Sequence, residues 1–323
     1  MFPRAFLRAA AAAVLWSSFL PLPAGAGDLA PASPEPVLTT GIEDPMAVLH
    51  FGRRGSATNL APLAMGSVSY RHEFKADFDD LPGDLSIDDF TLWGSLPPLS
   101  WDRSHLIPMF SYRGTWLNGS GGSPVPDDDL HAFRLPLIFL QDVSEDFLWG
   151  AMVMPGYSGD ASGWQSDALT FAAALGAGYM VNPELRVFAG VYYSHAVDNE
   201  FLVPGVAFSW RPHADWEVYL YPPIAGINYN LGDHWLAGLF GRYDATAWFV
   251  EGGRRAPDLE ATLRGTRVGL KLEGRVWNRI WAYAAGGYSF GRELEVDRTR
   301  GRTLFDEDID NSPFVQFGFN LRY

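Results

Sequence analysis

The chain has 323 residues, no cysteine, and a formal net charge of −14 at pH 7, with 38 acidic residues against 24 Lys and Arg. The lack of cysteine excludes disulfides, thiolate metal sites and a lipid-modified cysteine anchor. The acidic balance argues against nucleic acid as a partner, because neutralising phosphates needs clustered Lys and Arg. Aromatic residues make up 15% of the chain and charged residues only 19%, a balance unusual for a soluble enzyme.

Residues 1–26 have the pattern of a secretory signal peptide. Arg4 and Arg8 form a short basic start, residues 9–22 are apolar, and Ala24 and Ala26 frame a small-residue cleavage site. The apolar run is shorter than the roughly 20 residues that a spanning helix needs, which favours cleavage over a retained anchor. The later sequence offers no uninterrupted apolar run of that length, so a further membrane crossing would use strands.

Residues 27–61 are rich in Pro, Ala and Gly and show little alternation. This composition is typical of a flexible segment and predicts a periplasmic lead-in to the domain that follows. The alternative is a plug that enters the interior of that domain.

Residues 62–323 alternate between apolar and polar, the pattern of strands with one lipid-facing and one lumen-facing side. In the first run, Tyr70 and Phe74 share one face while Arg71 and Glu73 share the other. The alternation returns in segments 106–116, 131–139, 184–194 and 267–276. We therefore predict an all-β fold, a closed antiparallel transmembrane β-barrel, because an open sheet edge would leave backbone groups unpaired in hydrocarbon.

The phase of this alternation reverses near Gly265. Polar residues occupy even positions in segment 260–266 and odd positions in segment 267–275. A one-residue slip exchanges the two faces of a strand, and glycine is the residue that a bulge accommodates most easily. The pattern predicts a β-bulge at Gly265.

The last segment alternates up to the final aromatic residue. Phe317, Phe319, Leu321 and Tyr323 share one face, with Gly318, Asn320 and Arg322 on the other. This segment resembles the closing strand of bacterial outer-membrane barrels, which ends on an aromatic residue and is read by the barrel-insertion machinery. A soluble sandwich that ends on an edge strand is the alternative, and it would leave the signal peptide unexplained.

The number of strands follows from the spacing of turns and loops, since inner turns are short and outer loops long in such barrels. Turn-like connections occur at residues 97–104, 142–146, 182–183, 211–215, 232–233 and 278. Loop-like stretches lie at residues 77–84, 119–129, 158–165, 196–200, 252–258 and 297–312. Parity requires one more outer turn, and Pro222-Pro223 is the candidate because proline ends a ladder. The result is 14 strands, two of them short at about six to eight residues; if that hairpin does not span, the count is 12.

The face opposite the apolar one is predicted to line the lumen. Its charged residues are Arg71, Glu73, Arg113, Arg134, Arg242, Asp244, Arg264, Arg267, Lys271, Glu273 and Arg275. Mixed charges form either structural ion-pair networks or an ion-selective constriction, and both interpretations stay open. The central strands bring in small or apolar residues such as Met152 and Met154, against which a plug, a loop or an apolar solute would pack.

Acidic residues gather in the predicted outer loops. They are Asp77, Asp79, Asp80, Asp84, Asp127, Asp128, Asp129, Asp306, Glu307, Asp308 and Asp310. Facing lipopolysaccharide phosphates, they are candidates for binding divalent cations, which take carboxylate oxygens. The spacing of Asp306, Asp308 and Asp310 resembles the start of a calcium loop, but Asn311 replaces the required Gly. Solvated loop acidity is the simpler interpretation, and neither a defined metal centre nor a cofactor is predicted.

An enzyme at the barrel rim is the least favoured function. Ser194 and His195 are adjacent, so on a strand they would face opposite sides and would not form a nucleophile–base pair. The chain carries none of the common hydrolase, zinc-protease or phosphate-loop motifs. We predict no catalytic residue.

Residues 202–212 (LVPGVAFSWRP), followed by Tyr221-Pro222-Pro223 and residues 228–231 (NYNL), resemble a family of bacterial outer-membrane barrels of unknown function. The resemblance implies fold and location and carries no site. The partners expected are outer-membrane lipid, lipopolysaccharide and, during assembly, the insertion machinery. The favoured function is a passive or weakly selective channel for small solutes. A structural or surface-interaction barrel with a plugged lumen is second, and a rim lipid hydrolase third.

Overall fold

A computed structural model describes residues 58–121, 129–160, 165–197, 199–252, 257–299 and 302–322. The predicted signal peptide with Ala24 and Ala26, most of the lead-in, Asp127, Asp128 and Tyr323 lie outside these residues. Within them, the structure has no helix of sufficient length and apolarity to cross a membrane.

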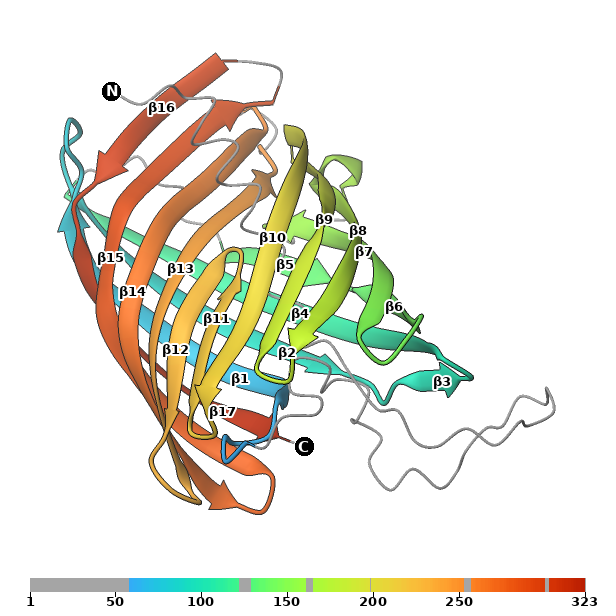
Figure 1. Ribbon diagram of the computed structural model, residues 1–323. Helices are drawn as coiled ribbons and strands as arrows, with labels where there is room; N and C mark the ends of the chain where they lie inside the picture. The colour runs from blue at the N-terminus through green and yellow to red at the C-terminus, as the bar shows by residue number, and fades with distance from the viewer. Residues whose placement is uncertain are drawn as a thin grey trace.

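The described strands form one antiparallel sheet that closes on itself, with β1 hydrogen-bonded to β17 (Figure 1). Their bounds are β1 Ala64–Asp77, β2 Asp84–Ser95, β3 Leu99–Trp101, β4 Ser104–Ser120, β5 Asp129–Arg134, β6 Leu137–Asp142, β7 Phe147–Gly159, β8 Leu169–Asn182, β9 Leu185–Ala196, β10 Asn199–His213, β11 Trp216–Tyr221, β12 Ile224–Asn230, β13 Trp235–Val250, β14 Leu259–Trp277, β15 Ile280–Arg298, β16 Arg302–Ile309 and β17 Ser312–Arg322.

Three strands of the wall are interrupted, so these segments make a barrel of 14 strands. Pro97 and Pro98 separate β2 from β3, which both pair with β4. Pro136 separates β5 from β6, which both pair with β7, and β16 and β17 both pair with β15. The predicted count of 14 is confirmed. The hairpin at Pro222-Pro223 is also confirmed, with strands of 6 and 7 residues.

The outer surface of the wall is apolar because alternate side chains of each strand point away from the interior. Leu202, Val206 and Leu270 are each about two-thirds exposed, at 67%, 66% and 67%. In the closing strand, Phe317, Phe319 and Leu321 are exposed on the same outer surface. Large apolar side chains this exposed fit a surface that faces hydrocarbon.

The interior is divided into zones along the barrel. A central-strand cluster of apolar side chains, which includes Ile107, Met152, Met154, Phe188 and Tyr192, covers the inner face of β4 and β6–β10. Met152 and Met154, predicted to face a plug or solute, thus pack among neighbouring wall residues. An outer-end cluster fills the end of the barrel with the long connections; its members are Ala76, Phe78, Leu85, Ile87, Leu117, Leu130, Trp248, Val250, Ala261, Leu263, Leu294, Val296 and Ile309.

The predicted phase reversal has a different origin from the one expected. β13 pairs regularly with β14 through Asp244 and Gly265. The irregularity lies in the β14–β15 ladder beside Gly265, and the additional residue belongs to β15, near Gly291, whose φ is +54°. On β14 the odd residues from Leu259 to Glu273 face inward. Its outer third looked reversed because Ala261 and Leu263 join the outer-end cluster while their neighbours face outward.

The wall is interrupted above the short β11–β12 hairpin, which ends part of the way along β10 and β13 (Figure 1). In the described ladders, residues 201–207 of β10 pair with β9 alone. β13 leaves the hairpin after Tyr243, whose N–H donates to the carbonyl of Pro223. Its outer part crosses to β7, where Phe249 and Gly159 form a parallel bridge. We call the region between these two edges the wall gap.

The segment before β1 lies at the end of the barrel that carries the short turns. Leu60 and Ala61 are buried against Leu236 and Trp281. The Asn59 side chain donates a 2.8 Å hydrogen bond to Asp215 in the β10–β11 turn. The last four residues of the predicted lead-in are therefore attached to the barrel.

Candidate functional site

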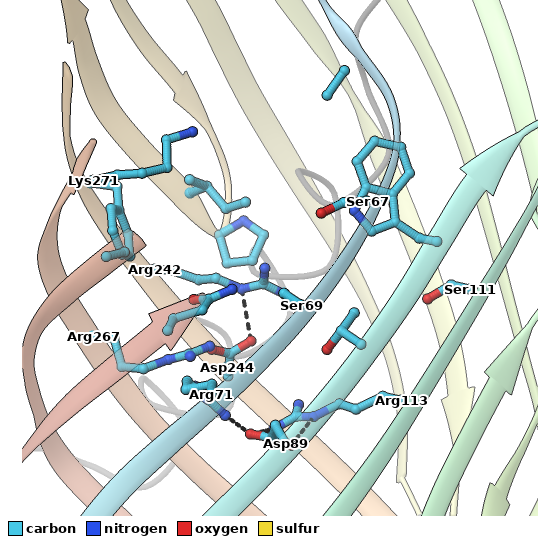
Figure 2. Close-up of a pocket in the computed structure, with 18 of the residues that line it drawn as sticks. Ser67, Ser69, Arg71, Asp89, Ser111, Arg113, Arg242, Asp244, Arg267 and Lys271 are labelled. Carbon is cyan, nitrogen blue, oxygen red and sulfur yellow. Dashed lines mark hydrogen bonds and ion pairs between the residues drawn. The ribbon is translucent and has the colours of Figure 1, made fainter. Parts of the chain in front are cut away.

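A cavity of about 430 Å³ occupies the middle of the barrel (Figure 2). One side of it is formed by β1, β2, β4 and β5 and the other by β11–β15 and β17. Charged side chains on its lining are Arg71, Asp89, Arg113, Arg134, Arg242, Asp244, Arg267 and Lys271. They reach it because each occupies an inward position of its strand, opposite the apolar outer face.

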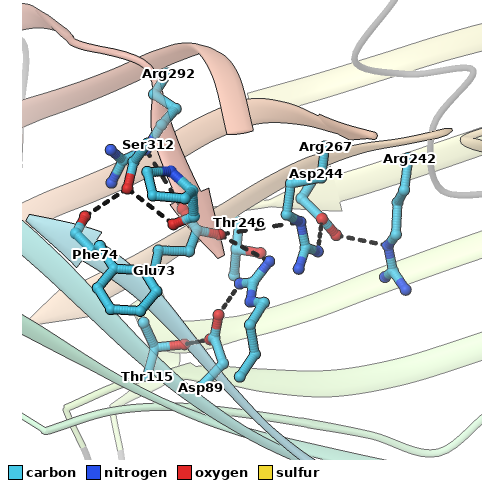
Figure 3. Close-up of polar contacts among 12 residues, drawn as sticks. Glu73, Phe74, Asp89, Thr115, Arg242, Asp244, Thr246, Arg267, Arg292 and Ser312 are labelled. Atoms are coloured by element: carbon cyan, nitrogen blue, oxygen red, sulfur yellow. Dashed lines mark hydrogen bonds and ion pairs between the residues drawn. The ribbon is translucent and has the colours of Figure 1, made fainter. Parts of the chain in front are cut away.

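Asp89 is the centre of a hydrogen-bond network at the outer side of this cavity (Figure 3). Its side chain is 3% exposed and accepts two hydrogen bonds from Arg113, at 2.7 and 3.0 Å. It also accepts a 2.6 Å bond from Thr115 and pairs with Arg71. Arg113 donates another bond of 2.9 Å to Thr246 on β13, so the network spans the interior from one wall to the other.

Glu73 and Asp244 hold the remaining arginines of this network. Glu73 lies 2.9 Å from Arg71, 3.4 Å from Arg292 and 4.0 Å from Arg267. Asp244 accepts a 2.8 Å bond from Nε of Arg242 and pairs with Arg267. The space left among these side chains is small, about 20 Å³. Among the described residues, this network and the outer-end cluster beyond it, where Trp248 is fully buried, fill the interior on the outer side of the cavity.

Cations outnumber carboxylates around the cavity. Among the described residues that line it, six carry positive charge and two, Asp89 and Asp244, carry negative charge. Arg134 has no carboxylate within 4.0 Å in the described part of the chain, whereas Arg71, Arg113, Arg242 and Arg267 each have at least one. The lining itself therefore carries an excess of positive charge, whose field is screened less by low-dielectric walls than by water.

A second cluster lies nearer the periplasmic end. Glu273, fully buried, accepts hydrogen bonds of 2.6 and 2.7 Å from Arg322 and one of 2.8 Å from Asn320. Lys271 lies 3.2 Å from the same carboxylate. Arg322 also donates to the carbonyl of Pro62, which ties the closing strand to the segment before β1. These contacts are structural, because they use up the acceptor atoms of Glu273.

Most residues predicted to line the lumen face the interior, and two do not. Arg264 was predicted inside but lies on the outer face of β14, where it pairs with Glu293 at 2.8 Å and Glu295 at 2.6 Å. Arg275 is exposed at the periplasmic end, 3.0 Å from Nδ1 of His234.

Sequence reasoning missed two central members of the network, Asp89 and Arg292. In β2 the inward residues change from apolar, at Leu85 and Ile87, to polar at Asp89, so the strand shows no single phase. Arg292 lies beside the irregularity of β15, where alternation gives no direction. The acidic pair of Asp88 and Asp89 was the one available signal.

The acidic residues of the outer end are only partly in loops. Residues 302–309, expected within a loop, form β16, which extends the wall outward. Asp84 begins β2, where it lies 3.0 Å from Lys75. Within the described ranges, the structure brings together no group of three or more His, Asp or Glu side chains placed to hold a metal ion.

The residues weighed as a rim enzyme are placed on two sides of the wall. Ser194 is buried at 4% exposure, whereas His195 is exposed and lies 3.1 Å from Glu200 on the neighbouring strand. The two side chains of this pair do not meet. As expected from the strand geometry, this pair offers no nucleophile activated by a base.

A closed antiparallel sheet with an apolar exterior and a charged interior defines a transmembrane β-barrel of the bacterial outer-membrane type. The chain is an outer-membrane β-barrel with a cationic internal cavity. No protein-family model matches the chain, and no curated protein is similar to it in sequence.

Several solved structures are similar to the chain. An outer-membrane channel from Pseudomonas putida F1 is 11% identical, covers 83% of this chain and 98% of its own, and has a TM-score of 0.41. The P. putida toluene transporter TodX is 8% identical over 82% and 91%, with a TM-score of 0.37. The porin KdgM, in complex with disordered oligogalacturonate, is 10% identical over 80% and 99%, with a TM-score of 0.33.

Proposed function

We propose that the protein is a passive, weakly selective channel for small solutes, which pass through the central cavity and the wall gap. One observation carries this proposal. Pro223, Ile224 and Tyr243 line the cavity, and the same residues form the lower border of the wall gap. The cavity therefore reaches the side of the barrel at the one level where the described wall is incomplete.

The backbone of the gap supports this route. Leu202 and Val206 are highly exposed apolar residues on the outer face of β10, which puts its free edge at the depth of the membrane. Irregular or unpaired backbone is tolerated at that depth only where it is covered by protein or lines a water-filled space. A hydrated passage between β10 and β13 meets this condition, whereas the closed outer end offers no comparable path.

The proposal is tested by single-channel conductance of the refolded protein in a planar lipid bilayer. Because the chain has no cysteine, Ala245→Cys introduces a unique thiol on the part of β13 that lines the cavity beside the gap. We expect a bulky methanethiosulfonate reagent to reduce its conductance by more than half. Ala237→Cys, on the lipid-facing side of the same strand, is the matched control and should conduct unchanged after the same treatment.

A second candidate, a structural barrel with a closed lumen, is favoured by the outer-end cluster and the network beneath it. Its acidic outer surface would then face lipopolysaccharide. Deleting residues 27–57 tests whether this segment blocks the lumen, and the deletion leaves the contacts of residues 58–62 intact. A folded barrel that stays electrically silent before and after this deletion would overturn the channel and favour the structural function.

A further inference from the structure

We infer that the central cavity is a binding site for a small organic anion, a carboxylate on an apolar body, which Arg134 and Arg242 hold by its charge. The inference rests on the proposed function in that the bound anion would be a permeating solute. It goes beyond that function in naming the chemical class of the solute and the residues that select it.

The arginines that line the cavity differ in how many of their nitrogens are paired with carboxylates. In the network, the oxygens of Asp89 are taken by Arg71, Arg113 and Thr115. Arg242 donates to Asp244 through Nε alone in the described hydrogen bonds, and its side chain remains 37% exposed to the cavity. Among the described hydrogen bonds its two terminal nitrogens have none, which leaves them available to a carboxylate, the group that a guanidinium binds with two parallel hydrogen bonds.

Arg134 is the second free cation of the cavity. Its strand, β5, pairs with β7 at Gly156, and a Cβ placed on that glycine would lie 3.2 Å from Cγ of Arg134. The stem of Arg134 therefore packs against Gly156, and the residue lines the cavity. A partly buried charge without a carboxylate partner is costly unless water or a ligand compensates it. An anion in the cavity supplies that compensation.

Part of the remaining lining is apolar and suits the body of an organic ion, beside the hydroxyl and amide side chains of Ser67, Ser111 and Gln316. Trp93, Tyr219, Ile224, Phe240 and Tyr283 contribute aromatic and aliphatic surface to the same cavity. A volume of about 430 Å³ lies within the range of pockets that enclose small organic ligands. A ring or short chain with one carboxylate satisfies both parts of this lining.

The test compares benzoate with benzyl alcohol, its neutral analogue, by isothermal titration calorimetry on the refolded full-length barrel. We expect benzoate to bind and benzyl alcohol to bind at least tenfold more weakly. Arg134→Gln and Arg242→Gln should each reduce benzoate affinity about tenfold. Arg275→Gln, which removes an arginine at the exposed periplasmic end, is the matched control and should bind as the parent does.

Reversal potentials in a KCl gradient measure the selectivity for anions over cations, and this second measurement does not depend on which organic anion is chosen as the ligand. The parent should prefer chloride over potassium, and the Arg134→Gln/Arg242→Gln double variant should lose most of that preference. Equal affinity for benzoate and benzyl alcohol, or unchanged benzoate affinity in both single variants, would overturn the inference. Conductance without benzoate binding overturns the site and leaves the channel. Benzoate binding in an electrically silent barrel supports the site and overturns the channel.

Discussion

The side chain of Arg292 passes directly over Gly265, so that a Cβ placed on this glycine would lie 3.2 Å from Cγ of the arginine. From there Arg292 reaches Glu73, with Nε 3.4 Å from the carboxylate. Gly265 is thus what lets a β15 residue cross β14 and enter the network.

Gly265→Val should displace Arg292 and weaken its contact with Glu73. We expect a loss of about 1–3 kcal/mol in the free energy of unfolding, the usual cost of overpacking a filled interior. Urea unfolding in lipid vesicles, followed by tryptophan fluorescence, measures it. Gly205→Val is the matched control on β10, since a Cβ there meets nothing within 4 Å. An equal loss in both variants would mean that strand propensity, not the crossing of Arg292, sets the effect.

Asp89→Asn should be more destabilising than most single substitutions in this barrel. It keeps the shape of the side chain but leaves Arg71 and Arg113 without the charge of their shared carboxylate. Removing one partner of a buried pair costs about 3–5 kcal/mol, because the remaining charge is uncompensated. The same unfolding measurement applies, with Asp88→Asn, which faces outward beside His72, as the control. A loss no larger than that of the control would contradict the central place given to Asp89.

Trp248→Ala should both destabilise the barrel and open its outer end. Trp248 is fully buried in the outer-end cluster, and truncating such a side chain costs about 3–5 kcal/mol and leaves a cavity. We expect larger or more frequent conductance steps in planar bilayers than in the parent. Trp277→Ala, at a side chain that is 74% exposed near the β14–β15 turn, serves as the control. Unchanged conductance in Trp248→Ala would show that the network beneath closes the path by itself.

The attachment of the segment before β1 should depend on pH. The hydrogen bond from Asn59 holds the pKa of Asp215 below its ordinary value. A lowered pKa in the folded state contributes stability above the ordinary carboxyl pKa of about 3.9, and this is lost as pH falls through the folded value. A fluorophore on Asn59→Cys would itself remove the bond, and Thr58 also donates through its hydroxyl to the carbonyl of Ala214, so the label belongs on Ser56→Cys. Its anisotropy should fall below about pH 4, and Asp215→Asn should flatten that transition.

The period-two pattern predicted the wall well wherever lipid is outside and polar groups are inside. It gave 14 strands, and parity alone placed the short hairpin at Pro222-Pro223. The same reasoning misplaced Arg264, because the inward residues of that part of β14, Ala261 and Leu263, are apolar and join the outer-end cluster. It missed Asp89 because the inward residues of β2 change from apolar to polar, so the strand does not alternate regularly. It missed Arg292 because the irregularity in β15 changes which residues face inward. The wall gap depends on where β13 crosses to β7, a tertiary contact that no local pattern encodes.

The crossing of β13 to β7 also bears on how such a barrel could change its size over evolution. Apart from Phe78, which directly follows β1, the buried side chains of the outer-end cluster come from β1, β2, β4, β5 and β13–β16, and among the described residues none comes from β7–β12. The outer-end cluster therefore does not depend on how many strands lie between β7 and β13. A hairpin gained, lost or lengthened there would change the circumference of the barrel and the shape of the wall gap and would leave the outer-end cluster unchanged.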